Sequence, residues 1–143
     1  MPKRRQPKGL TLLGRSETGV PAKPSVSILE TFPNPAARPY WIRFESADFT
    51  SLCPITGQAD FAEMTIEYQP AKRCLETKSL KFYLASYRSE RAFNEEVTNR
   101  ILDDLVAACH PRKMIVRAEF ASRGGICLTV NVSYPDELDA AAP

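Results

Sequence analysis

The chain has 143 residues, of which 43% are hydrophobic and 25% charged, and its formal net charge is +2. This length supports one domain, because a second would leave both hydrophobic cores thin. The net charge is too small for a protein whose main ligand is nucleic acid. No apolar run approaches the ~20 residues of a membrane span, and no signal peptide follows the basic start. We therefore expect a cytoplasmic protein without nucleic-acid or membrane partners.

The four cysteines are widely and irregularly spaced, and no Cys-x-x-Cys pair occurs. The only histidine, His110, directly follows Cys109. Structural zinc sites usually draw on paired ligands at short spacing, so we expect no bound metal. Without an export signal, free thiols in a reducing compartment are the default.

Composition divides the chain into three parts. Residues 1–37 are rich in proline and are predicted to form an irregular arm. Two apolar segments of this arm, 10–13 and 28–32, are expected to pack on the domain or on a neighbouring subunit. Residues 38–135 are predicted to form a single domain, and residues 136–143 a frayed tail.

The hydrophobic period changes twice along the domain. Hydrophobic and polar residues alternate over residues 40–45 and 63–68. The period is helical over residues 80–87 and 97–109, and alternation returns over residues 114–120 and 126–132. This order predicts an α+β fold, in which helices cover one face of an antiparallel sheet. Because such a sheet leaves two apolar edges, we expect several copies to close a ring edge to edge.

The segment 49–60, between the first two predicted strands, holds Cys53 and Asp60. Pro54 and Gly57 interrupt regular pairing, so we expect both residues in a loop or bulge that can fold back on itself. Loops carried by rigid strands often hold catalytic groups. Two interpretations stay open from these residues alone: a nucleophilic thiol beside a carboxylate, or a half-buried structural cysteine near a solvated aspartate.

The first predicted helix begins in the segment Glu76-Thr77-Lys78-Ser79-Leu80-Lys81-Phe82-Tyr83. Thr77 suits an N-cap, which would leave free backbone N–H groups on the first turn. Lys78 and Lys81 lie near one face of that turn. The helix start is therefore a candidate phosphate site, and a solvated basic face is the equal alternative. No Gly-x-Gly-x-x-Gly motif occurs, so a dinucleotide would not bind in the Rossmann manner.

The second predicted helix begins at Asn94-Glu95-Glu96. Asn94 is a plausible N-cap, and acids are favoured at the positive end of a helix. Alternatively, one glutamate accepts two N–H donors from the edge of a heterocycle. The turn at Arg123-Gly124 is a weaker candidate for anion binding, because it offers a cation and accessible backbone.

Together these segments resemble the NADPH-dependent 7-cyano-7-deazaguanine reductases, the nitrile reductases of queuosine biosynthesis, in their short single-domain form. The resemblance is carried by Cys-Pro-x-Thr-Gly-Gln-x-Asp, by Glu-x-Lys-Ser-x-Lys and by segments 29–34 and 122–126. It extends from about residue 10 to residue 134. It implies the tunnelling fold, whose subunits form β-barrels with active sites at subunit interfaces.

The resemblance also implies roles for individual residues. Cys53 would be the nucleophile that forms a thioimide with the nitrile, and Asp60 its acid/base partner. The residues assigned to the deazapurine substrate are Asn94, Glu95, Glu76 and Ser79. The residues assigned to NADPH are Thr77, Lys78, Ser79, Lys81, Arg123 and Gly124.

The chain departs from the family pattern at Asn94, where the family typically has histidine. An asparagine can form hydrogen bonds with the substrate but cannot transfer a proton. Two other functions stay open. One is a zinc-dependent cyclohydrolase of the same fold, disfavoured because a lone histidine does not supply the usual ligands. The other is a non-catalytic purine- or pterin-binding oligomer in which Cys53 is inert.

Overall fold

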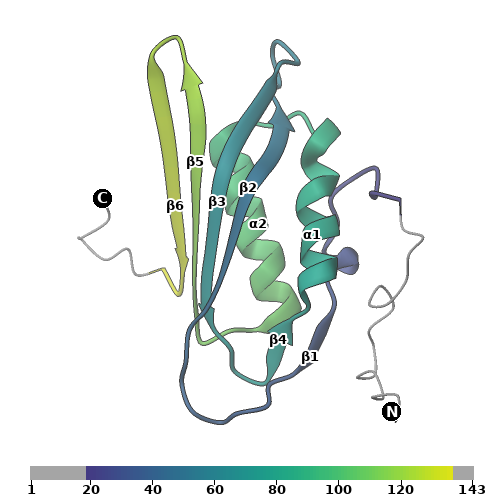
Figure 1. The fold of residues 1–143 in the computed structure, drawn as a ribbon, viewed down its shortest axis with the longest axis vertical. Helices are drawn as coiled ribbons and strands as arrows, with labels where there is room; N and C mark the ends of the chain where they lie inside the picture. The colour runs from purple at the N-terminus through teal and green to yellow at the C-terminus, as the bar shows by residue number, and fades with distance from the viewer. Residues whose placement is uncertain (1–18, 137–143) are drawn as a thin grey trace.

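The computed structural model describes residues 19–136 (Figure 1). Its elements in chain order are η1 (Val26–Ile28), β1 (Thr31–Pro33), β2 (Ile42–Leu52), β3 (Ala59–Gln69), β4 (Arg73–Leu75), α1 (Thr77–Ala85), η2 (Ser86–Ser89), α2 (Asn94–Cys109), β5 (Lys113–Arg123) and β6 (Ile126–Tyr134). The predictions for the arm segment 10–13 and for most of the C-terminal tail lie outside the described residues.

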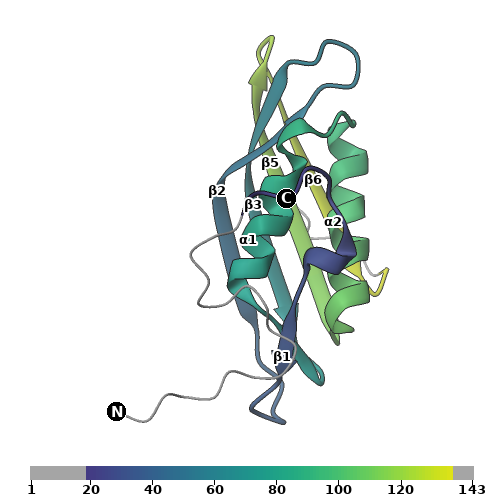
Figure 2. The same cartoon turned by 90° about the vertical axis from the view of Figure 1, so that its right-hand side faces the viewer.

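Four long strands form one antiparallel sheet in the order β2-β3-β5-β6. Both α-helices lie on the same face of this sheet (Figure 2). The predicted α+β fold is therefore confirmed. In a single chain the sheet is open, and β2 and β6 are its edges. Within residues 19–136, no helix has the length and apolar character needed to cross a membrane.

The core lies between the sheet and the helices because every second strand residue faces α1 and α2. On β3 the inward side chains are buried from Ala62 to Tyr68, and on β5 from Met114 to Phe120. The helices bury one apolar stripe each, at the predicted period; its central residues are Leu80, Tyr83 and Leu84 on α1, and Val97, Ile101 and Leu105 on α2. The outward residues of β3 and β5, such as Glu63 and Glu119, are exposed.

The described part of the arm packs on its own domain, which confirms one of the two options for segment 28–32. Strand β1 pairs with β4, with Thr31 opposite Leu75. Ile28 and Leu29 pack against the hydrophobic core. This small second sheet was not predicted, because three-residue strands carry too little periodic signal.

The predicted loop around Cys53 is shorter than the sequence suggests. β2 continues to Leu52 and β3 begins at Ala59, so only residues 53–58 lie between the strands. The alternation is hidden by one extra residue in β2, where the register shifts between Ser46 and Phe49. The prediction that Asp60 lies in a loop was wrong, because Asp60 pairs with Ser51 inside the sheet.

The predicted helix caps were wrong by one residue at both helices. Glu76 is the N-cap of α1, where Thr77 was expected, and its carboxylate accepts the backbone N–H groups of Lys78 and Ser79. Phe93 is the N-cap of α2, where Asn94 was expected, and it makes no side-chain capping bond. The far end of α2 closes at His110, which adopts a left-handed conformation with φ 46°.

Candidate active site

The turn between β2 and β3 is held by its own backbone. The Cys53 N–H donates to the Gln58 carbonyl at 2.8 Å, and the Gly57 N–H donates to the Cys53 carbonyl at 2.9 Å. Gly57 has φ +71°, and a Cβ there would lie 2.7 Å from the guanidinium of Arg91. The positive φ therefore favours glycine here, whereas the contact with Arg91 involves the far end of a flexible side chain, which can shift. This rigid turn fixes Cys53 at the end of β2.

The surroundings of Cys53 favour its thiolate. A hydrogen bond from the Thr56 side chain, followed by bonds from the backbone of Thr56 and Ile55, lowers the pKa of Cys53 to about 7. Partial burial and the negative charge of Asp60 act in the opposite direction. A partly exposed thiol with a lowered pKa is typical of a nucleophilic cysteine and atypical of a structural one.

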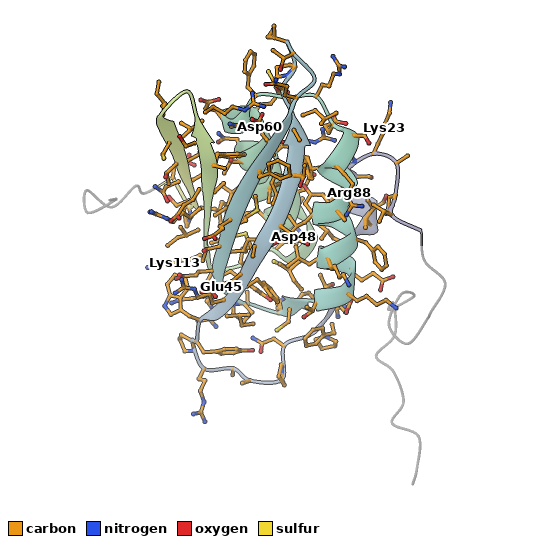
Figure 3. The ribbon with its side chains drawn as sticks, turned by 45° about the horizontal axis from the view of Figure 1, so that its top comes forward. Lys23, Glu45, Asp48, Asp60, Arg88 and Lys113 are labelled. Carbon is orange, nitrogen blue, oxygen red and sulfur yellow. The ribbon has the colours of Figure 1, made fainter. Side chains whose placement is uncertain are left out.

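Asp60 is the first inward-facing residue of β3, and its side chain is only 9% exposed. One carboxylate oxygen, Oδ1, lies 2.9 Å from Nε of Arg123, the last residue of β5. Nη2 of Arg123 also donates to the Ala59 carbonyl at 3.0 Å. Figure 3 shows Asp60 near the end of the paired strands β2 and β3. The structure thus places the predicted acid/base group against a cation from a different hairpin.

A short connector brings the start of α2 to the same end of the sheet. The Leu52 N–H donates to the Glu90 carbonyl, and the Ala92 N–H donates to the Leu52 carbonyl. Arg100 braces this connector, because it pairs with Glu90 at 3.2 Å and donates to the Pro24 carbonyl at 3.1 Å. Residues 94 and 95 therefore begin α2 beside the Cys53 turn (Figure 1).

Two buried polar atoms at this end have no hydrogen-bond partner within the described structure: Oγ of Ser51 and Oδ1 of Asn94. Buried polar groups are normally paired, so such atoms are candidates for contact with a ligand or a water. Glu95 and Glu96 on the first turn of α2 are both exposed. Sequence reasoning missed Ser51, because the extra residue in β2 hides the alternation that turns it inward.

The residues at the start of α1 lie at the opposite end of the sheet, beside β4 (Figures 1 and 2). Glu76 is buried, and its two carboxylate oxygens accept from Lys78 N–H and Ser79 N–H, each at 2.7 Å. The Ser79 hydroxyl accepts from Glu30 N–H and donates to the Glu76 carbonyl. The amides of Lys78 and Ser79, which were expected to be free for phosphate, are therefore bonded. The roles assigned to these residues stay predictions.

A groove of about 330 Å³ runs between the edge strand β2 and α1. Its strand wall includes Asp48 and Thr50, and its helix wall includes Thr77, Lys81 and Arg88. Figure 3 shows Asp48 and Arg88 on opposite sides of it. Of the residues assigned to the cofactor, Thr77 and Lys81 line this groove, whereas Gly124 lies in the exposed β5–β6 turn.

Within residues 19–136, no three His, Cys, Asp or Glu side chains come together as a metal-binding group. His110 is exposed at the end of α2 opposite Asn94. The four cysteines are all free thiols, and two of them, Cys74 and Cys109, are buried.

The chain is similar to several known proteins. Residues 59–139 match the family described as QueF-like protein. A 7-cyano-7-deazaguanine reductase of Nitrosococcus oceani, named as NADPH-dependent, is 53% identical over 116 residues, which cover 80% of this chain and 89% of that protein. The same-named enzyme of Syntrophus aciditrophicus is 54% identical, covering 87% of this chain and 86% of that one.

The chain belongs to this reductase family. The predicted family, an oxidoreductase family that uses NADPH, is therefore confirmed. A crystal structure of the archaeosine synthase QueF-Like, in its apo form, has a TM-score of 0.63 and 26% identity to this chain. The matched region covers 67% of this chain and 94% of the chain in that structure. This likeness supports the predicted tunnelling fold.

Proposed function

We propose that the chain reduces the nitrile of 7-cyano-7-deazaguanine to the primary amine 7-aminomethyl-7-deazaguanine, with NADPH as reductant, in queuosine biosynthesis. The observation that carries this proposal is the Cys53 thiol, whose pKa is lowered to about 7 in the turn where the family resemblance places the nucleophile. Queuosine is a modified nucleoside of tRNA, but the nitrile and the amine named here are small deazapurines. The proposed partner is therefore a small molecule and not the tRNA.

In the proposed mechanism, the Asp60 carboxylate takes the Cys53 thiol proton as the sulfur adds to the nitrile carbon, and delivers that proton to the nitrogen, giving a thioimide. NADPH supplies hydride to that carbon, and collapse of the adduct releases the thiolate and leaves an imine. A second hydride and a proton give the amine. The change from nitrile to amine takes four electrons, which corresponds to two NADPH. Covalent catalysis helps because a thioimide accepts hydride more readily than a nitrile does.

The substrate edge is assigned to Glu95, because a carboxylate that faces two N–H donors makes charge-assisted hydrogen bonds. Asn94 lies beside it with a buried, unpaired oxygen, which supports a contact with the substrate. The cytoplasm is the proposed compartment, because this chemistry needs a reduced thiol and disulfides are rare there.

We propose further that each active site is shared between subunits. Cys53 follows β2, and the start of α1 lies at the opposite end of the same sheet (Figure 1). Within residues 19–136, neither edge of this sheet pairs with a further strand, apart from a single bridge between Leu52 and Arg91. Edge-to-edge closure of several copies brings one chain's α1 near another chain's Cys53 turn and removes the exposed edges.

The test is intact-protein mass spectrometry with the nitrile in the absence of NADPH, followed by nitrile-dependent NADPH oxidation. One thioimide adduct per chain is expected, and it is absent in Cys53→Ala. Cys127→Ala, which removes the exposed thiol, is the matched control and keeps the adduct. An adduct that survives Cys53→Ala, or NADPH oxidation that does not depend on the nitrile, contradicts the proposal. Metal analysis of the active protein separates this function from a zinc cyclohydrolase.

A further inference from the structure

Two irregularities lie on either side of β3 at the same level. β2 carries one extra residue between Ser46 and Phe49, and β5 carries one between Phe120 and Arg123. Phe49 and Phe120 both pair with Ala62 of β3. An extra residue reverses which face of the sheet the following side chains occupy.

The consequence is that both neighbouring strands direct polar groups toward Asp60. In β5 the residues with even numbers are buried up to Phe120, so an uninterrupted strand would turn Arg123 to the outer face. After the extra residue, Arg123 returns to the inner face and contacts Asp60. On the other side, β2 places Ser51 opposite Asp60, with Cys53 two residues further on.

Arg123 makes two contacts at the start of β3. Its Nε pairs with Asp60 Oδ1 at 2.9 Å, and its Nη2 donates to the Ala59 carbonyl at 3.0 Å. One guanidinium therefore binds both the Asp60 carboxylate and the Ala59 carbonyl. The Asp60 side chain is 9% exposed and that of Arg123 is 42% exposed, so the anion is buried and its counterion reaches in from solvent. Removal of the counterion would leave a buried, unpaired carboxylate.

We propose that Arg123 is a positioning residue: its guanidinium is the counterion of the Asp60 carboxylate and offsets the effect of that negative charge on the neighbouring Cys53 thiol. The catalytic meaning of this inference rests on the proposed function. The charge of Asp60 raises the pKa of the Cys53 thiol, against the hydrogen bonds that lower it, and a cation on Asp60 opposes that effect. Other charged groups at this end include Arg91, against Gly57, the Glu90–Arg100 pair of the connector and the acids at the start of α2.

The resemblance assigns Arg123 to NADPH, and that role does not require the ion pair. The two roles separate when the thiol is titrated without NADPH and without the nitrile. The readout is the pH dependence of Cys53 alkylation by iodoacetamide, followed by peptide mass spectrometry. A Cys127→Ser background removes the other exposed thiol.

In this background the alkylation midpoint is expected near pH 7. Arg123→Gln should raise it by roughly half a unit to one unit, because an opposite charge has been removed from the cluster. Arg123→Met, which keeps the aliphatic stem, repeats the measurement if the Gln variant does not fold. Arg123→Lys should restore most of the shift. Arg117→Gln is the matched control, because Arg117 pairs with Glu119 on the same strand and not with Asp60.

A double-mutant cycle assigns the effect to Asp60. Asp60→Asn alone should lower the midpoint, and Arg123→Gln should then shift it less, because the guanidinium has lost the partner that holds it beside the thiol. An unchanged midpoint in both neutral Arg123 variants, or an equal shift with and without the Asp60 charge, overturns the inference. Because no substrate is present, these outcomes do not depend on whether the chain reduces the nitrile. Failure of nitrile-dependent NADPH oxidation would instead reject the proposed function.

Discussion

The two ends of the sheet carry the two most distinctive segments of this chain, and their polar groups are satisfied differently. At the start of α1, the Glu76 carboxylate and the Ser79 hydroxyl bond to nearby backbone groups. At the Cys53 turn, the backbone is bonded, but Oγ of Ser51 and Oδ1 of Asn94 are buried without partners in the described structure. A thiol with a lowered pKa lies among them.

The difference separates groups that stabilise the fold from groups available to a ligand. Satisfied polar groups near a helix start fix that helix and the arm that packs on it. Unsatisfied ones beside an ionisable thiol are kept at a cost in stability, which is typical of functional sites. The groove between β2 and α1 extends from the start of α1 toward the Cys53 turn, because both Lys81 and Thr50 line it.

The largest expected effect comes from mixing two inactive variants. Cys53→Ala lacks the nucleophile, and the double variant Lys78→Gln with Lys81→Gln lacks the assigned cofactor cations. If active sites are shared between subunits, co-refolded mixtures contain some sites with both intact halves. NADPH oxidation should then recover from background, while either variant alone stays inactive. A mixture that stays inactive, in mixed oligomers verified by mass spectrometry, places both halves of the site on one chain.

Asp60→Asn should lower turnover by roughly 10²–10⁴-fold, the usual contribution of a general acid–base group. It should not abolish the thioimide, because Cys53 ionises more readily once the adjacent negative charge is gone. Stopped-flow NADPH oxidation and adduct mass spectrometry measure the two steps separately. Asp48→Asn, at the exposed bulge of β2, is the matched control. Turnover within a few-fold of the unmodified protein would reject Asp60 as the proton carrier.

Glu95→Gln should weaken nitrile binding far more than Glu96→Gln does. Hydrogen bonds to a charged group are each worth roughly 1.5–3 kcal/mol, so the loss is expected to be about ten-fold or more. Both residues are exposed on the first turn of α2, which makes them a matched pair for the helix-dipole effect. Isothermal titration with Cys53→Ala measures binding without covalent chemistry. Equal losses would mean that neither carboxylate is specific for the substrate.

These residues also show how much of the fold and of the candidate site the sequence alone predicts. The sheet and its covered face are predicted by the alternation of apolar residues in β3 and β5 and by the apolar stripe of α2. These patterns are informative because the spacing of apolar residues along an element reflects which of its faces is buried. The position of Asp60 was mispredicted because one extra residue in β2 hides the continuation of the strand. The contact between Arg123 and Asp60 joins residues 63 positions apart, through a second irregularity, and no local pattern reports such a pairing. The family resemblance proposes roles for individual residues, but it does not say where the fold places them.

The smallest expected effect tests which residue caps α1. Glu76→Ala should destabilise the protein by about 1–3 kcal/mol, because it removes the cap and leaves the amides of Lys78 and Ser79 without their acceptor. Thr77→Ala should change stability little, since Thr77 is exposed and Glu76 makes the capping bonds. Urea unfolding of the two variants, without substrate, compares them directly. The reverse order would restore Thr77 as the cap that the sequence suggests.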